Sequence, residues 1–156
     1  MNAATETAAY ERTLTIAASP ETVWEFFVDP QKTTRWMGVE AQLDARPGGG
    51  YRCVVLPGHV ALGEFVELDR PHRLVFSWGW ENQAENYGVP PGSSTIEVEL
   101  TPEGDGTRVR FVHRNLPTPE SVASHSHGWD HYLPRLEHAA AGRDPGEDPW
   151  LTEGPS

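Results

Sequence analysis

The sequence contains one cysteine, Cys53, among its 156 residues. A single thiol can form neither an internal disulfide nor a cysteine-rich zinc site. Cys53 lies in the run YRCVVL, whose composition is typical of a strand. We therefore interpret Cys53 as a small buried side chain and not as a reactive thiol.

Long apolar runs and basic residues are also scarce. No stretch approaches the roughly 18 apolar residues of a membrane helix, and the start MNAATETAAYER has no basic region followed by an apolar run. Twelve Lys and Arg stand against 23 Asp and Glu, a formal net charge of −11. This charge repels nucleic-acid phosphates and anionic lipid surfaces. We predict a cytoplasmic protein that binds neither nucleic acid nor membrane.

Sequence motifs of several large enzyme classes are missing. There is no phosphate loop, dinucleotide fingerprint, nucleophile elbow or kinase signature. The glycines of 47–50 precede a strand pattern and no helix follows them, which favours a turn over a phosphate cradle. The sequence predicts no cofactor.

The length suits one domain with a core large enough to need no disulfide or metal. We expect a single domain over residues 8–142, a disordered N-terminus over 1–7 and an extended C-terminal tail over 143–156. The tail is rich in proline, glycine and acidic residues, and it has Trp150 and Leu151 as its apolar anchors.

The N-terminal part predicts a strand followed by a broken pair of helices. Alternation over 10–17 favours a strand, and Ser19-Pro20-Glu21 is typical of a helix start. Asp29-Pro30 interrupts the helical pattern before a second short helix over 31–36. From residue 39 onward the pattern changes to short alternating runs, as an antiparallel meander requires. The predicted strands of this meander are 40–44, 50–56, 60–68, 72–80, 94–101 and 107–114.

The last periodic segment predicts a long helix from the cap Thr118 to Gly142. At about 100° per residue, one apolar stripe forms around Trp129. It comprises Val122, His125, Trp129, Tyr132, Leu133, Leu136 and Ala140. His127, His131 and His138 fall on the opposite face, where we expect solvent. His127 and His131 are one turn apart and could share a metal ion, but no third ligand is predicted nearby, so we predict no metal site.

Four large side chains share one face of the strand RLVFSWGW, namely Leu74, Phe76, Trp78 and Trp80. The apolar stripe of the final helix is the long element available to cover them. A curved sheet around one helix need not close at its wide end, so we expect a hollow lined by aromatic rings, as small-molecule pockets are.

Acid–base chemistry in such a hollow would need a titratable group with a shifted pKa. His113, His125 and Tyr132 are the candidate catalytic residues. Glu64 is a further candidate that also suits the exposed side of a strand.

The order of these elements, together with five short motifs, resembles the SRPBCC or START-like superfamily. Within it the sequence is most similar to the group of homologues of the activator of heat-shock protein 90 ATPase. The motifs are SPETVW at 19–24, Asp29-Pro30 with Arg35-Trp36, GEFVEL at 63–68, PHRLVFSW at 71–78, and His125 with Gly128-Trp129, Leu133 and Leu136.

The resemblance implies an α+β helix-grip fold, with a curved antiparallel sheet of about six or seven strands around a long C-terminal helix and two short helices after the first strand. It also implies a cavity beneath the long helix. Carried over by position, the ligand-binding candidates are Phe27, Trp36, Met37, Val66, Phe76, Trp78, Val98, Phe111, His113, His125, Trp129 and Leu133. Relatives commonly have a second aromatic residue at the position of Met37, which suggests a wider or more adaptable mouth here.

The resemblance implies no single reaction. The function we expect is binding of a hydrophobic lipid, polyketide or aromatic molecule by a monomer or homodimer. An enzyme acting on such a molecule, of the cyclase, dehydratase or hydrolase type, is the alternative. A protein-interaction or chaperone-associated module that uses the outer sheet face is the second alternative.

Overall fold

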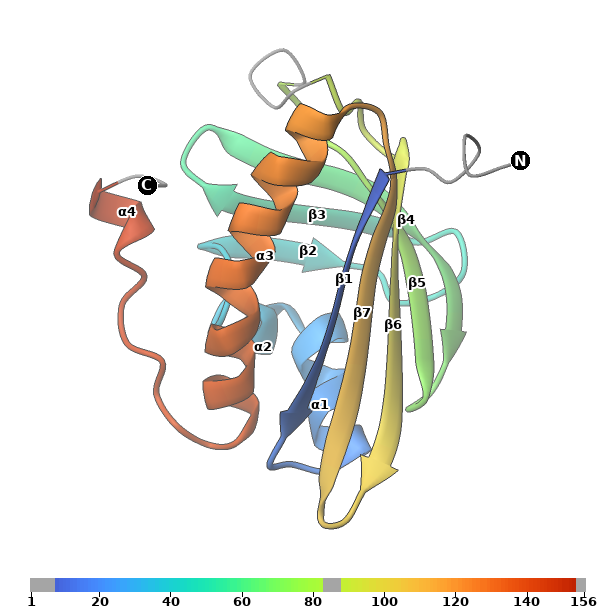
Figure 1. The fold of residues 1–156 in the computed structure, drawn as a ribbon, viewed down its shortest axis with the longest axis vertical. Coiled ribbons are helices and arrows are strands. Elements are labelled where there is room, and N and C mark those ends of the chain that lie inside the picture. The colour runs from blue at the N-terminus through green and yellow to red at the C-terminus, as the bar shows by residue number, and fades with distance from the viewer. Residues whose placement is uncertain (1–7, 83–87, 154–156) are drawn as a thin grey trace.

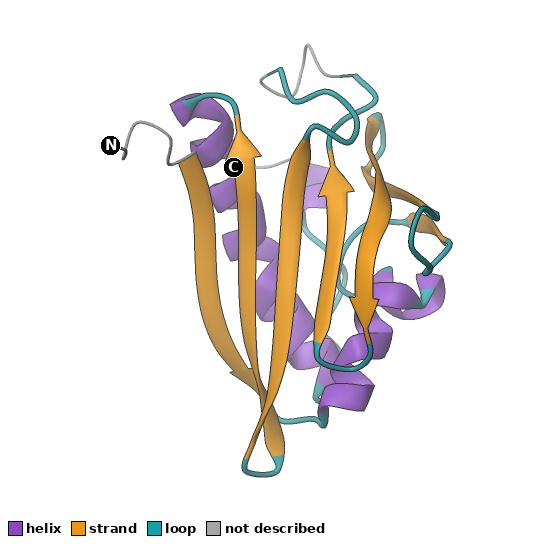
Figure 2. Ribbon diagram, turned by 90° about the vertical axis from the view of Figure 1, so that its right-hand side faces the viewer, coloured by secondary structure: helices purple, strands orange, loops and turns teal. Residues whose placement is uncertain are grey.

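A computed structural model describes residues 8–82 and 88–153, and it folds as one curved sheet with helices on its concave side (Figures 1 and 2). The seven strands are antiparallel in the order β1-β7-β6-β5-β4-β3-β2. The elements are β1 Ala8–Ile16, α1 Pro20–Val28, α2 Pro30–Thr33, β2 Glu40–Leu43, β3 Gly50–Leu56, β4 His59–Asp69, β5 Arg73–Trp78, β6 Ser94–Glu103, β7 Gly106–Leu116, α3 Pro119–Ala140 and α4 Trp150–Glu153. The predicted helix-grip architecture is confirmed.

The helices begin where the capping residues predict. The Ser19 hydroxyl accepts from the Thr22 N–H at 3.2 Å, and Thr118 and Ser121 satisfy each other's backbone N–H groups at 3.0 Å. The predicted bounds of the second short helix were wrong. Asp29 caps α2 instead of only interrupting the pattern, so the helix begins at residue 30 and ends at residue 33.

β4 contains a bulge that the sequence pattern did not reveal. Phe65 pairs with Phe76 and Glu67 pairs with Val75, so Val66 is an extra residue between two paired positions. As a consequence Val66 is 57% exposed, while Phe65 points inward. The prediction that Val66 lines the inner wall was therefore wrong, and Phe65 takes that place.

α3 crosses the concave face of the sheet and is joined to β1 along its side (Figure 1). The Tyr10 hydroxyl donates to Asp130 at 2.7 Å, and Arg12 lies 3.3 Å from the same carboxylate. Burial, together with this hydrogen bond, raises the pKa of Tyr10 to about 12. The predicted stripe of α3 is buried except for Val122, which is partly exposed. None of the helices in the described residues is both long and apolar enough to cross a bilayer.

The segment after α3 covers part of the helix face that we expected to meet solvent. The ring of Trp150 stacks on that of His131 at 3.7 Å and on that of His127 at 5.2 Å. His131 Nε2 also lies 2.8 Å from an oxygen of the buried Asp148. The prediction that His131 faces solvent was therefore wrong. The angular positions of residues around a helix do not take into account the chain that folds back over it. His127 and His138 are exposed.

Residues 1–7, which we predicted to be disordered, lie outside the described residues. Residues 154–156 of the predicted tail also lie outside them. Cys53 is fully buried as predicted, and burial raises the pKa of its thiol to about 12. The thiol is therefore protonated at neutral pH.

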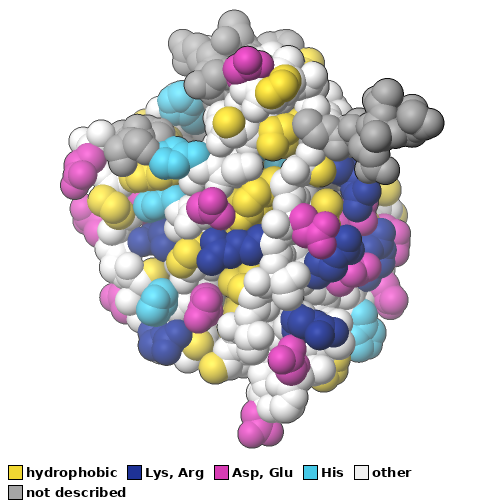
Figure 3. Space-filling view, viewed as in Figure 1, with side chains coloured by type: hydrophobic (Ala, Val, Ile, Leu, Met, Phe, Trp, Pro, Cys, Tyr) yellow, Lys and Arg dark blue, Asp and Glu magenta, His cyan; other side chains and the backbone are white. Residues whose placement is uncertain are grey.

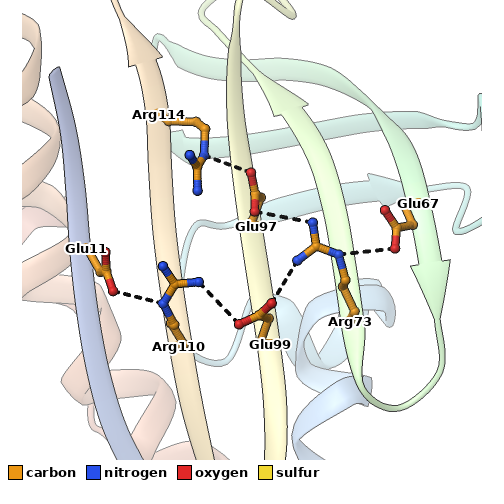
Figure 4. A network of polar contacts seen from close by, with 7 residues as sticks. All are labelled: Glu11, Glu67, Arg73, Glu97, Glu99, Arg110 and Arg114. Atoms are coloured by element: carbon orange, nitrogen blue, oxygen red, sulfur yellow. Dashed lines mark hydrogen bonds and ion pairs between the residues drawn. The ribbon is translucent and has the colours of Figure 1, made fainter. Parts of the chain in front are cut away.

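A network of ion pairs crosses the outer face of the sheet (Figure 4). Arg73 on β5 contacts carboxylates on β4 and β6 at 3.0–3.3 Å, and Arg110 on β7 joins β6 to β1 at 2.9–3.2 Å. Glu97 serves two arginines, Arg73 at 3.3 Å and Arg114 at 2.8 Å, and its side chain is 18% exposed. The network therefore links five neighbouring strands, with Glu97 as its most buried member.

We expect Glu97→Gln to lower the free energy of unfolding by about 1 kcal/mol, because a shared and largely desolvated carboxylate contributes more than an isolated surface pair. Glu103→Gln is the control, since Glu103 is exposed and lies 3.9 Å from Arg108. Urea unfolding in 0.05 M and 1 M NaCl measures both variants, and salt should shrink the Glu97 effect. Equal losses in the two variants would contradict a network centred on Glu97.

Candidate functional site

The middle of α3 packs against a group of aromatic rings on the inner face of β5 and β7. The ring of Trp129 lies 5.2 Å from that of Trp78 and 4.7 Å from that of Phe111. His113 lies beside both indoles at 6.0 Å. Alternation along the strands puts Trp78, Phe111 and His113 on the concave face, where the stripe of α3 meets them. We call Trp78, Trp80, Phe111, His113, His125 and Trp129 the inner cluster.

His113 is held by hydrogen bonds at both ring nitrogens. The Trp129 indole N–H donates to His113 Nδ1 at 3.0 Å. Ser94 donates its hydroxyl to the Trp78 carbonyl at 2.7 Å, so the 2.8 Å contact between Ser94 Oγ and His113 Nε2 uses the imidazole N–H as donor. His113 is therefore a neutral imidazole protonated at Nε2.

His125 is held in the opposite tautomer. The Trp80 indole N–H donates to His125 Nε2 at 3.0 Å, and His125 Nδ1 lies 2.7 Å from the Ser121 carbonyl, which can only accept. The rings of His113 and His125 meet edge to face at 5.0 Å. All four imidazole nitrogens are thus engaged within the protein.

Burial keeps both imidazoles neutral. It lowers the pKa of His113 well below the usual histidine value, and the nearby His125 lowers this pKa further. Burial also lowers the pKa of His125, against which the hydrogen bond to the Ser121 carbonyl acts. Neither histidine can exchange a proton with a ligand unless one of these hydrogen bonds breaks.

The indole N–H of Trp78 is the exception in the inner cluster. Trp78 is 2% exposed, and its Nε1 has no hydrogen-bond partner within residues 8–82 and 88–153. A buried donor left without an acceptor costs about 1–3 kcal/mol. The cluster therefore holds one strong donor directed at no acceptor, among groups that are otherwise paired.

The expected hollow is not present between the predicted lining residues. Apart from Val66, all of them are at most 6% exposed. A hollow large enough for a ligand would leave accessible surface on the side chains around it. The rings interlock instead, and Tyr51 on β3 also stacks on Phe76 at 4.5 Å. Among the described residues the inner cluster is thus closed, and Tyr51 adds aromatic volume that the sequence pattern did not suggest.

Apart from the exposed Val66, the predicted ligand-binding residues fall into three groups. Trp78, Phe111, His113, His125 and Trp129 meet in the inner cluster. Phe27 and Trp36 contact each other at 5.6 Å beside α1 and α2, where the Trp36 indole donates to the Phe26 carbonyl at 2.9 Å. The remaining inward residues are buried elsewhere in the same core, and these are Met37, Phe76, Val98 and Leu133.

Of the candidate catalytic residues, Tyr132 lies outside the inner cluster and is not hydrogen-bonded to His113 or His125. It contacts His131 and Trp150 on the side of α3 that the C-terminal segment covers. Burial raises the pKa of Tyr132, and the negative charge of Asp148 raises it further. Glu64 is exposed on β4.

Three residues that hold the cluster together were not among the predicted site residues, namely Trp80, Ser94 and Ser121, although Trp80 was placed on the inner face of its strand. The signals existed for two of them. Trp80 shares a face with Trp78, and Ser94 alternates in phase with Ile96 and Val98. Ser121 contacts His125 through its backbone carbonyl, and no pattern of side chains predicts such a contact. Among the described residues, no group of three or more His, Cys, Asp or Glu side chains could hold a metal ion.

Comparison with known proteins places this geometry in a family. Residues 17–141 match the family model described as "Activator of Hsp90 ATPase homolog 1-like protein". A solved AHSA1-like protein from Rhizobium etli is 44% identical and superposes with a TM-score of 0.73, over 93% of this chain and 89% of that one.

Two further solved structures share the fold. An HSP90 activator from Plasmodium falciparum is 25% identical with a TM-score of 0.70, over 83% of this chain and 94% of that one. An Aha1 dimer from Colwellia psychrerythraea is 18% identical with a TM-score of 0.72, over 85% and 96% of the two chains. No curated protein matches the sequence significantly.

The buried neutral histidines predict acid sensitivity. Their folded-state pKa values lie below the ordinary value of 6.5, so the unfolded chain binds more protons, and stability is lost as the pH falls below about 6.5. Each histidine contributes a slope of at most about 1.4 kcal/mol per pH unit. Urea unfolding of wild type between pH 7.5 and 5 should show this loss.

His113→Gln provides the comparison, since an amide can still donate and accept hydrogen bonds but does not titrate. The slope of its unfolding free energy between pH 6.5 and 5 should be about half that of the wild type. An unchanged slope would mean that His113 is not the neutral, buried group described above.

Proposed function

This chain belongs to the family of Activator of Hsp90 ATPase homolog 1-like proteins in the SRPBCC superfamily, and we propose that it binds a small, mainly aromatic molecule between α3 and the sheet. The ligand carries an oxygen that accepts a hydrogen bond from the Trp78 indole. Aromatic rings of the inner cluster contact its apolar part.

The unpaired Trp78 N–H is the observation that carries this proposal. Buried polar groups in native proteins are paired in the large majority of cases, so an unpaired one calls for an explanation such as a functional role. In the inner cluster the other two indoles and both imidazoles have partners. A ligand acceptor at Trp78 would complete the set.

The ligand enters by separation of the first half of α3 from the sheet. The buried residues in 119–128 are Ser121 and His125, whereas the second half of the helix buries Trp129, Leu133 and Leu136. Burial of apolar surface contributes about 25 cal/mol per Å², so the first half is bound more weakly. The hydrogen bond from Trp80 to His125 is the main polar contact that must open there.

The geometry supports binding better than the enzyme alternative of a cyclase, dehydratase or hydrolase. Both nitrogens of His113 and of His125 already have partners, so neither is poised as an acid or base. The alternative of an interaction module on the outer sheet face receives little support, since the arginines and glutamates there neutralise one another (Figure 4).

Acetophenone and ethylbenzene test the proposal, because they have nearly the same shape and differ by one carbonyl acceptor. We expect acetophenone to bind wild type about tenfold more tightly than ethylbenzene, the factor given by one desolvated hydrogen bond of about 1.4 kcal/mol. Shifts of the tryptophan indole signals in ¹H–¹⁵N spectra measure both affinities.

Trp78→Phe should abolish the preference for the carbonyl compound, whatever its effect on ethylbenzene. Trp150→Phe is the matched control, since Trp150 lies on the outer side of α3, and it should keep the tenfold preference. Failure of both compounds to bind wild type, or equal affinities for them, would contradict the proposal.

A further inference from the structure

A second candidate site lies outside the core, where the chain after α3 folds back along the helix (Figure 1). We call residues 143–153 the C-terminal tail. Arg135 on α3 holds it by donating to the carbonyls of Pro145 at 3.3 Å and Gly146 at 2.9 Å. The same guanidinium donates through Nε to the Trp36 carbonyl at 3.2 Å. One arginine thus fastens the tail to the segment that follows α2.

A pocket of about 180 Å³ remains between these two segments. Its walls come from residues 34–38, from Arg135 and from residues 146–148 and 151. At about 30 Å³ per water molecule, the volume suits a ligand of roughly six non-hydrogen atoms. The pocket is bounded by the tail on one side, so it exists only while the tail is docked.

The charges that line this pocket have opposite signs and are not fully paired with each other. Arg135 has no carboxylate within ion-pair distance among the described residues, and two of its five N–H groups make none of the bonds above. Asp148 is buried, and its hydrogen bonds from His131 and from the Trp150 N–H use Oδ1. Its neighbour Glu147 is exposed at the rim. On this face, acidic, basic and histidine side chains lie close together (Figure 3).

Tyr132 lies in the core close to one of these charges. Its side chain is 3% exposed, and burial raises its pKa. The charge of Asp148 and a side-chain hydrogen bond with this carboxylate raise the pKa further. Tyr132 therefore belongs to the surroundings of Asp148, whereas Asp148 and Arg135 line the pocket itself.

We propose that this pocket binds a small zwitterion, an α-amino acid of the size of alanine. Its carboxylate accepts from the free N–H groups of Arg135. Its ammonium group donates to Asp148 Oδ2 and to Glu147. Charge-assisted hydrogen bonds of this kind are about twice as strong as neutral ones, and each half of the ligand meets the opposite charge.

The mixed lining selects against simpler ligands. A plain anion would be attracted by Arg135 but repelled by Asp148 and Glu147. A plain amine would be attracted by the two carboxylates but repelled by Arg135. A ligand larger than about seven heavy atoms exceeds the pocket volume. Because binding joins the tail to residues 34–38, it also stabilises the docked tail.

Titration of ¹⁵N-labelled full-length protein with L-alanine, acetate and ethylammonium tests the proposal. L-alanine should shift the amide signals of Gly38 and Gly146 saturably and bind about tenfold more tightly than either of the other two compounds, since it gains a second charged contact. No saturable shift with L-alanine, or equal binding of acetate or ethylammonium, would overturn it.

Discussion

The packing of α3 onto an aromatic wall is the constraint that organises this protein. Indole, imidazole and phenyl rings cannot be left exposed over the concave face of a sheet without a large cost in hydration. Trp129 covers the wall at Trp78 and Phe111. Because indoles and imidazoles also carry polar nitrogens, the same contact that excludes water must supply hydrogen bonds.

The two histidines meet this requirement. His113 accepts from Trp129, and His125 accepts from Trp80, so each imidazole pairs an indole that would otherwise be an unsatisfied buried donor. The Ser94 hydroxyl and the Ser121 carbonyl then take the remaining imidazole protons. The histidines are thus structural acceptors in the closed protein, which explains why residues that suggest acid–base catalysis need not perform it.

The two sites proposed here lie on opposite sides of α3 and use different physics. The inner cluster offers apolar surface and one indole donor, and access to it requires the weakly packed first half of the helix to move. The pocket at the C-terminal tail offers charges of both signs and is open to small polar molecules. Arg135 joins its walls by donating hydrogen bonds to three carbonyls. Two of these carbonyls belong to Trp36 and Pro145, which are 99 and 10 residues from Arg135 in the sequence.

Local chemistry is what the sequence by itself determined. The caps at Ser19 and Thr118, the alternation along β5 to β7 and the stripe around Trp129 depend on neighbours a few residues away, and all were predicted. The family motifs likewise gave the helix-grip architecture. These features are encoded by side chains that act on their own backbone or on one face of their own element.

Only the tertiary structure decided features that depend on distant partners. The bulge that turns Val66 outward follows from the pairing of β4 with β5. The cover over His131 requires a tail that returns along α3, and the closed core requires Tyr51 from β3 to stack on Phe76. In each case the free energy comes from contacts between segments far apart in the chain, which no local pattern of residues can specify.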